Sequence, residues 1–143
     1  MIRIFYWIIF LLLIPILVLS DDINYGSFDN VEYVRNYDGD TITVNIKDVH
    51  PLIGSNISVR INGIDTPEMK SQCFNAKSKA LEAKYIVENL CKTGKITLKN
   101  VNRDKYFRIL SDVYVDNKKI ADILIEKRLA IPYNGGTKID WCE

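Results

Sequence analysis

The spacing of apolar residues along this chain changes from a period of two to a helical period and back, which restricts the possible fold strongly. Apolar and polar residues alternate over residues 41–46 and 57–61, as in strands with one buried face. Between residues 75 and 90 the apolar positions recur at helical spacing, and Thr93-Gly94 ends the run. The predicted order is strands at 31–35, 41–46 and 57–61, a helix at 75–90, strands at 95–100 and 109–115, a short helix at 120–127 and an irregular tail.

Five short strands with interposed helices predict an α+β, mainly β fold. We expect a five-stranded Greek-key barrel similar to the OB-fold, with two or three helices. A loop over residues 47–56 is expected between the second and third strands, and Asn62-Gly63 is a turn signal. Alternation within residues 57–61 predicts that Arg60 points away from the core side of its strand.

The N-terminus carries a separate signal. Arg3 precedes an uninterrupted apolar run from Ile4 to Leu19, which ends just before Ser20. As a helix this run would span about 24 Å, less than the roughly 30 Å hydrocarbon core of a bilayer. We predict that residues 1–20 are a signal peptide of a secreted or periplasmic protein. The alternative is an uncleaved membrane anchor formed by residues 4–19.

The remaining chain is long enough for one domain. Removing residues 1–20 leaves about 120 residues, which can bury one core but not two. We expect a flexible, polar lead-in at residues 21–30 and a single domain at residues 31–143, active as a monomer without a stable protein partner. Because Arg3 is the only charged residue among residues 1–20, the rest of the chain has equal numbers of acidic and basic residues. A global basic field therefore does not attract nucleic acid to it.

Three cysteines follow the apolar run, so at most one disulfide can form within a monomer. Cys73 and Cys91 flank the predicted long helix and would be about 27 Å apart if it is straight, too far for a disulfide. Cys142 could pair with either of them. We favour Cys142 with Cys73, which would leave Cys91 as a free buried thiol.

Four short stretches carry residues that suit phosphodiester chemistry. They are Tyr37-Asp38-Gly39-Asp40-Thr41, Val59-Arg60-Ile61, Ile64-Asp65-Thr66-Pro67-Glu68 and Asp104-Lys105-Tyr106-Phe107-Arg108. Asp40 and Asp65, together with the backbone carbonyl of Thr66, could form an incomplete oxygen shell, which suits Ca²⁺ and several waters. Each stretch alone has an ordinary structural explanation, such as an Asp-Gly-Asp turn or the start of a helix.

The candidate general base and the phosphate ligands follow from the residue types. His50 is the only histidine and lies in the predicted 47–56 loop, so paired-histidine mechanisms are excluded. Glu68 is then the available base for activating water. Arg60 and Arg108 could hold phosphoryl oxygens, since a guanidinium donates two parallel hydrogen bonds and keeps its charge.

From about Val34 to Tyr133 the chain resembles the staphylococcal, or thermonuclease-type, nuclease family. The resemblance rests on Asp38 to Thr41, Arg60 to Glu68 and Asp104 to Arg108 in this order. It implies a five-stranded barrel and a Ca²⁺-dependent endonuclease that hydrolyses phosphodiester bonds of DNA and RNA, without sugar specificity, to 3′-phosphate products.

By position, the resemblance implies a role for each site residue. Asp40, Asp65 and Thr66 would bind the metal, and Arg60, Glu68 and Arg108 would be catalytic. Lys105 and Tyr106 would contact the terminal phosphate of the substrate, and Tyr133 would lie in the region that stacks on a base. The segment Ile131 to Gly136 departs from the aromatic-rich segment of the family, which weakens the assignment of Tyr133.

The sequence is also compatible with a function of a different class. A barrel of this kind can also be a catalytically inactive module that binds nucleic acid or protein. Such modules lose their acidic residues, whereas here Asp40, Asp65, Glu68, Arg60 and Arg108 are all present. The sequence therefore favours the enzyme.

Overall fold

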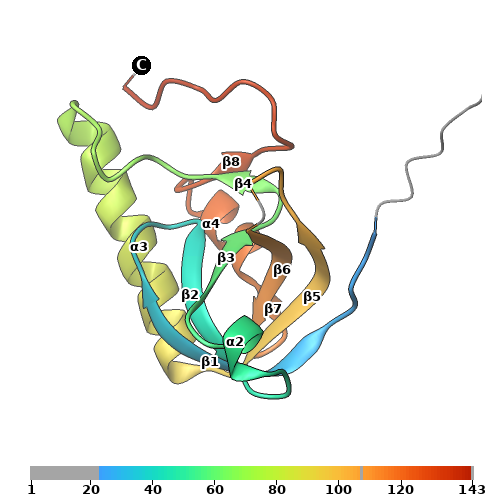
Figure 1. Cartoon of the computed structure of the whole chain (residues 1–143). Helices are drawn as coiled ribbons and strands as arrows, with labels where there is room; N and C mark the ends of the chain where they lie inside the picture. Colours follow the sequence, from blue (N-terminus) through green and yellow to red (C-terminus); the bar gives the residue numbers. More distant parts are fainter. Residues whose placement is uncertain (1–22, 107, 143) are drawn as a thin grey trace, which may run out of the picture.

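The computed structural model describes residues 23–106 and 108–142 (Figure 1). The predicted signal peptide or anchor at residues 1–20 lies outside these residues. In the part of the chain that the structure describes, no helix is long and apolar enough to cross a membrane.

Five strands form a closed barrel, which confirms the predicted fold class. The strands follow the order β3-β2-β1-β5-β6, and β6 pairs again with β3 to close it. The β3–β6 pairing is parallel, whereas the other pairings around the barrel are antiparallel. Register shifts interrupt the β1–β2, β1–β5 and β5–β6 ladders, and such bulges bend strands sharply enough for closure. The bounds are β1 Phe28–Asn36, β2 Thr41–Ile46, β3 Ile57–Ile61, β5 Ile96–Arg103 and β6 Ile109–Val115.

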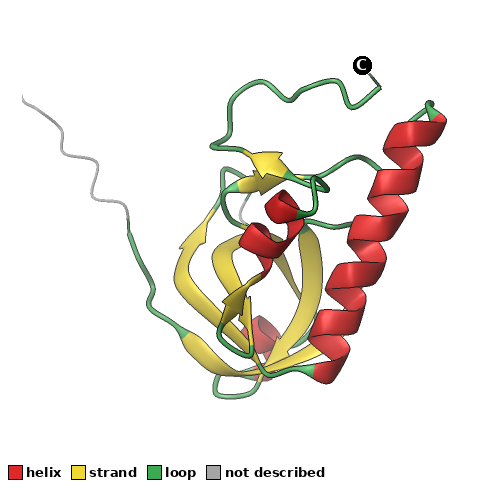
Figure 2. Ribbon diagram, turned by 180° about the vertical axis from the view of Figure 1, so that it is seen from behind, coloured by secondary structure: helices red, strands yellow, loops and turns green. Residues whose placement is uncertain are grey.

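Shorter elements decorate the barrel (Figure 2). A hairpin extends β6 into a two-residue strand, and a separate two-stranded sheet joins β4 to β8. The longest helix, α3, runs along the outside of the barrel in both views. The bounds are β4 Ile64–Asp65, β7 Lys118–Lys119, β8 Ile131–Pro132, α2 Pro51–Gly54, α3 Phe74–Thr93 and α4 Ile120–Glu126.

Small residues bring α3 close to the barrel. Its buried face consists of Ala76, Ala80, Ala83, Val87 and Cys91. The helix approaches the turn before β2 so closely that a Cβ on Gly39 would lie 2.7 Å from the Cβ of Ala83. The Asn36 side chain adds a polar link, since its amide donates to the backbone carbonyls of Asp38 (2.8 Å) and Lys84 (3.1 Å). The helix therefore supports the turn that carries Asp38 and Asp40.

Several predicted bounds are confirmed and others need correction. The strands at 41–46, 57–61 and 109–115 have their predicted bounds. The flexible lead-in at 21–30 was predicted too long, because β1 already begins at Phe28. Before it, Tyr25 N donates to the Val101 carbonyl (2.7 Å) and Val101 N to the Gly26 carbonyl (3.0 Å). Backbone pairing of this kind needs no apolar side chains, so the polar composition of the lead-in did not reveal it.

The loop predicted at 47–56 contains the helical turn α2, and the tail predicted as irregular contains β8. His50, predicted to be a solvated loop residue, is exposed and caps α2. Its Nδ1 accepts a hydrogen bond from Leu52 N at 3.2 Å. Capping gives this histidine a structural role away from the carboxylates discussed below.

The disulfide joins Cys73, just before α3, to Cys142 near the C-terminus, as favoured from the sequence. Their Cα atoms are 5.7 Å apart. Cys91 is a free buried thiol, and burial raises its pKa to about 12. Such a thiol is inert at neutral pH, because the reactive thiolate form is almost absent.

Candidate active site

Strand register brings the stretches that carry the candidate site residues to one side of the barrel. Thr41 at the start of β2 pairs with Arg60 near the end of β3, and Arg60 also pairs with Leu110 at the start of β6. A cavity of about 700 Å³ opens where these strand ends meet. Its walls include most of the predicted site residues, namely Asp40, Arg60, Glu68, Lys105, Tyr106, Arg108 and Tyr133.

The turn before β2 holds two carboxylates side by side. Asp38 Oδ1 accepts hydrogen bonds from the backbone N–H groups of Asp40 (3.2 Å) and Thr41 (2.9 Å), which shapes the turn. Burial and the neighbouring charge of Asp40 raise the pKa of Asp38 to about 6. Asp38 also lines the cavity. The sequence did not indicate a functional role for it, because an Asp residue in a turn is usually explained by hydrogen bonds to its own backbone.

Arg60 links the two predicted metal-binding carboxylates. Its Nη1 lies 2.5 Å from Asp40 Oδ1, and its Nη2 lies 3.6 Å from Asp65 Oδ1. The same two nitrogens also donate to the carbonyls of Asp40 (3.2 Å) and Ile64 (3.0 Å). Only 8% of Arg60 is exposed, and its guanidinium lies among carboxylate and carbonyl oxygens in a nearly closed space.

Asp40, in the turn before β2, and Asp65, in β4, therefore both contact the Arg60 guanidinium. Asp40 Oδ2 accepts hydrogen bonds from the backbone N (3.2 Å) and Oγ1 (3.1 Å) of Thr66, the third predicted metal ligand. Asp65 is 1% exposed and Thr66 is 2% exposed, and neither is among the residues that line the cavity. Asp65 Oδ2 accepts a long hydrogen bond from Trp141 Nε1 at 3.4 Å.

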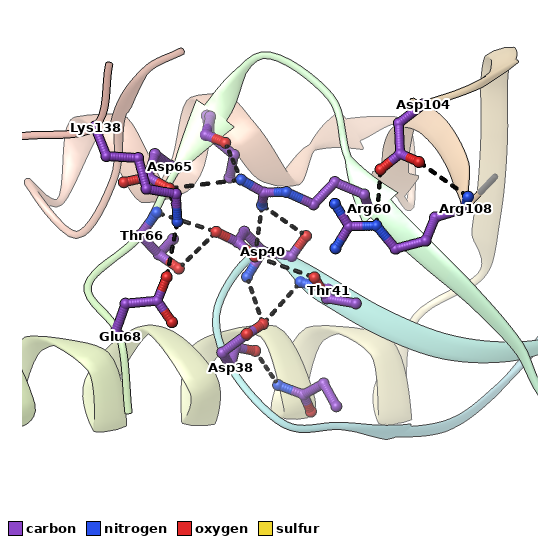
Figure 3. Close-up of polar contacts among 12 residues, drawn as sticks. Asp38, Asp40, Thr41, Arg60, Asp65, Thr66, Glu68, Asp104, Arg108 and Lys138 are labelled. Carbon is purple, nitrogen blue, oxygen red and sulfur yellow. Dashed lines mark hydrogen bonds and ion pairs between the residues drawn. The ribbon is translucent and has the colours of Figure 1, made fainter. Parts of the chain in front are cut away.

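Lys138 lies between Asp65 and Glu68 and was not anticipated from the sequence (Figure 3). Its ammonium is 2.9 Å from Asp65 Oδ1 and 2.7 Å from Glu68 Oε1. Burial alone would lower the pKa of Lys138, but Glu68 and Asp65 outweigh it and raise the pKa above its ordinary value. Glu68 itself is 64% exposed and open to water. Local sequence gives no signal for this contact, which depends on how the tail folds back.

Arg108 sits on the opposite side of the cavity and is held by Asp104 (Figure 3). Asp104 Oδ2 accepts from Arg108 Nε at 2.7 Å, and Oδ1 accepts from the backbone N–H groups of Tyr106 and Arg108. Burial would raise the pKa of Asp104, but these hydrogen bonds and the guanidinium lower it overall. Asp104 thus keeps its charge and orients Arg108, leaving the remaining guanidinium N–H groups for another acceptor.

The weaker predicted substrate contacts lie on the cavity rim. Tyr106 is 66% exposed, and its ring centroid is 5.2 Å from Lys105 Nζ and 5.5 Å from Arg108 Cζ. Tyr133 lines the same cavity, and its hydroxyl donates to the Gly136 carbonyl at 2.8 Å. An exposed aromatic ring beside cations is suited to contact a base or phosphate, but these contacts alone do not define a role.

The donor set fits a hard cation in one respect that the structure shows directly. Asp65 Oδ1 is fully buried, and the groups beside it are two cations, Lys138 at 2.9 Å and Arg60 at 3.6 Å. Within residues 23–106 and 108–142, no three His, Cys, Asp or Glu side chains form a ready-made metal cluster. Ca²⁺ does not need one, because backbone carbonyls and waters complete its shell.

A family model described as staphylococcal nuclease homologue matches residues 58–139, which is more than half of the chain. The chain belongs to the staphylococcal nuclease family. The match includes Arg60, Asp65, Glu68 and Arg108, and it begins after the Asp38 to Thr41 turn. Asp40 of this staphylococcal nuclease homologue lies outside the matched residues and contacts them through its ion pair with Arg60.

Two curated relatives of this family member come from Bacillus subtilis (strain 168). Endonuclease YncB is 35% identical over 115 residues, covering 76% of this chain and 52% of the relative. The SPbeta prophage-derived endonuclease YokF is 36% identical over 110 residues, covering 73% of this chain and 35% of the relative. The chain thus spans about half or less of the length of these relatives.

Proposed function

We propose that this chain is a calcium-dependent, sugar-nonspecific nuclease that hydrolyses phosphodiester bonds of DNA and RNA to 3′-phosphate products. The observation that carries the proposal is one cavity that gathers a carboxylate base, two arginines and the acidic turn of Asp40. Membership of the staphylococcal nuclease family supports this reading, as do two relatives named endonucleases.

The proposed metal ligands are Asp40, Asp65 and the backbone carbonyl of Thr66. The burial of Asp65 Oδ1 supports this choice, because a buried carboxylate oxygen needs a cation beside it, and Lys138 and Arg60 stand there at 2.9 Å and 3.6 Å. Bound Ca²⁺ would supply Lewis-acid polarisation of a phosphoryl oxygen.

Glu68 is the proposed general base. Its carboxylate lines the cavity yet is largely exposed, so water can reach it and it can take the proton of an attacking water. Lys138 pairs with the same carboxylate at 2.7 Å. A neutral glutamine at this position could hold a water but not accept its proton.

Arg60 and Arg108 are the proposed phosphate ligands. Arg60 reaches the cavity from β3 and Arg108 from the residue before β6, so a phosphate placed between them would receive hydrogen bonds from two directions. Charge that develops on the phosphoryl oxygens would be neutralised by fixed guanidinium groups, which need no reorganisation. Lys105, Tyr106 and Tyr133 on the rim are proposed to contact the substrate beyond the scissile bond.

Local charge, rather than a global field, would hold the substrate. The chain after residue 20 has equal numbers of acidic and basic residues, so affinity must come from the cations around the cavity. We expect binding of nucleic acid to weaken as salt rises, in proportion to the few phosphates contacted.

We further propose that the protein is exported, on the basis of the apolar run from Ile4 to Leu19. N-terminal sequencing of the protein recovered from the medium or periplasm tests this directly. A start near Asp21 means cleavage of a signal peptide, whereas an intact N-terminus in the membrane fraction means an anchor.

The activity test uses the full chain with single-stranded DNA, double-stranded DNA and RNA, each with Ca²⁺ or with chelator. We expect cleavage that requires Ca²⁺ and yields ends that need phosphatase treatment before polymerase extension. Binding without cleavage under every condition would instead favour the inactive binding module.

A further inference from the structure

The segment after β8 folds back over the candidate metal site. We call residues 133–142 the C-terminal strap. Both of its ends are fastened: Tyr133 N donates to the Gly63 carbonyl at 2.9 Å, and Cys142 is joined to Cys73 by the disulfide. The strap lies beside the start of α3 in both overall views (Figures 1 and 2).

Two side chains of the strap contact Asp65. Trp141 donates its indole N–H to one oxygen, and Lys138 places its ammonium 2.9 Å from the other. Asp65 is 1% exposed, so the strap and Arg60 together close this carboxylate off from water. A metal ion can reach Asp65 Oδ1 only if a group that now stands beside this oxygen moves.

Lys138 is the group that can move. Arg60 is buried and makes four polar contacts, whereas the Lys138 side chain is 47% exposed and, among the residues that the structure describes, is held by two carboxylates. Its ammonium stands between two carboxylate oxygens from different residues, which is where a small cation would be attracted. The ammonium carries one positive charge, so these carboxylates would attract a divalent ion more strongly than they attract the lysine.

We propose that Lys138 is a built-in competitor of the metal ion: its ammonium pairs with Asp65, a proposed metal ligand, and with Glu68, until a bound divalent cation displaces it from Asp65. This inference rests on the proposed calcium site. The strap would hold the lysine in place, so the apparent affinity for Ca²⁺ would include the free energy of expelling Lys138. The proposed Ca²⁺ site would then be occupied only at high Ca²⁺ concentrations.

The test measures Ca²⁺ binding to the full chain by isothermal titration calorimetry, without nucleic acid. Lys138→Met keeps the apolar stem and removes the ammonium, and Lys138→Gln provides a second, polar replacement. Lys138 makes two ion pairs, with Asp65 and Glu68, and its side chain is about half exposed. We therefore expect affinity for Ca²⁺ to rise by about 5- to 30-fold in both variants.

Lys47→Met is the matched control. Lys47 is also 47% exposed and lies 2.7 Å from a carboxylate, that of Glu32, but it does not line the cavity. The two Met variants change net charge equally, so a general charge effect would raise affinity in both. The proposal requires that the increase be confined to the Lys138 variants.

A second readout follows the lysine itself in the wild-type chain. Ca²⁺ should increase the rate at which an acetylating reagent modifies Lys138, measured by mass spectrometry, and leave Lys47 unchanged. Equal Ca²⁺ affinity in wild type and both Lys138 variants, or unchanged Lys138 labelling while Ca²⁺ binds, would overturn the competitor role and leave the nuclease proposal intact. No Ca²⁺ binding by any of these proteins would overturn the calcium site itself.

Discussion

The ammonium nitrogen of Lys138 lies 2.9 Å from Oδ1 of Asp65, a carboxylate that is 1% exposed. Asp65 therefore meets a lysine from the C-terminal strap and an arginine from β3 in the same buried space. The oxygen that Lys138 contacts is fully buried, so its partner must be a charged group of the protein or a bound cation.

Calcium should stabilise the fold through this carboxylate. A ligand that binds only the native state adds about 2.7 kcal/mol when its concentration is 100 times its Kd. We expect saturating Ca²⁺ to raise the melting temperature of the full chain by several degrees, and Asp65→Asn to abolish this rise. Differential scanning calorimetry with Ca²⁺ and with chelator measures both, and an undiminished shift in the variant would exclude Asp65 as a ligand.

Replacing Glu68 tests the general base. Glu68→Gln preserves size and exposure but removes the proton acceptor, so we expect turnover to fall by roughly 10²- to 10⁴-fold. The measurement is kcat on single-stranded DNA at saturating Ca²⁺, with an unchanged melting temperature as the control for folding. A variant that keeps more than half of wild-type turnover would mean that another group activates water.

Arg108 should matter for activity and little for stability. Its pair with Asp104 is partly exposed, and pairs of this kind contribute about 0–1 kcal/mol to the free energy of unfolding. We expect Arg108→Ala to lower turnover by roughly 10²- to 10⁴-fold while urea denaturation stays close to wild type, as for loss of a preorganised charge stabiliser. An unfolded variant would show that Arg108 is structural instead.

Unlike Arg108, Arg60 should contribute strongly to the stability of the fold when Ca²⁺ is absent. Its guanidinium is buried between Asp40 and Asp65, and removing one partner of a buried ion pair costs about 3–5 kcal/mol. We expect Arg60→Ala to lose stability of this size in urea denaturation with chelator present. Ca²⁺ should restore part of it, and a loss below about 1 kcal/mol would contradict the buried pairing.

The pH dependence of stability should involve Asp112, remote from the proposed metal ligands. Burial would raise its pKa, but hydrogen bonds from Asn100 (2.8 Å), Lys119 (3.1 Å) and Asn62 (3.3 Å) lower it overall. A lowered folded-state pKa means that this stabilisation is present above about pH 4, the unfolded value, and is lost as pH falls through the folded value.

We therefore expect Asp112→Asn to be less stable than wild type at pH 7 by about 1–3 kcal/mol, the usual cost of breaking a buried polar network. The difference should shrink as pH falls from 5 to 2, because wild type then protonates the carboxylate. Urea denaturation at several pH values measures this, and a constant difference across that range would rule out ionisation of Asp112 as its cause.

Strand positions could be predicted where one face of a strand is buried along its whole length. Alternation over residues 41–46 and 57–61 reflects this, and β2 and β3 have those bounds. The two-residue strands β4 and β8 could not be predicted, because two residues carry no period. The four-residue helix α2 was missed for the same reason.

Some residues of the candidate site could likewise be predicted from the sequence, and others could not. Asp40, Arg60 and Asp65 could be predicted to converge, because their stretches match a known family pattern and lie next to regular strands. Lys138 and Trp141 could not, since their contacts with Asp65 depend on the path of a tail without local periodicity. Asp38 was visible in the sequence, but its raised pKa comes from burial beside Asp40, which only the folded chain creates.

The disulfide between Cys73 and Cys142 also closes a covalent ring around the second half of the domain. The ring contains Arg108 and Lys138, whereas Asp40, Arg60 and Asp65 precede it in the chain. A single proteolytic cut anywhere inside the ring would leave both fragments covalently joined. The two halves of the candidate site would then stay together after such a cut, which would favour survival of the protein in protease-rich surroundings.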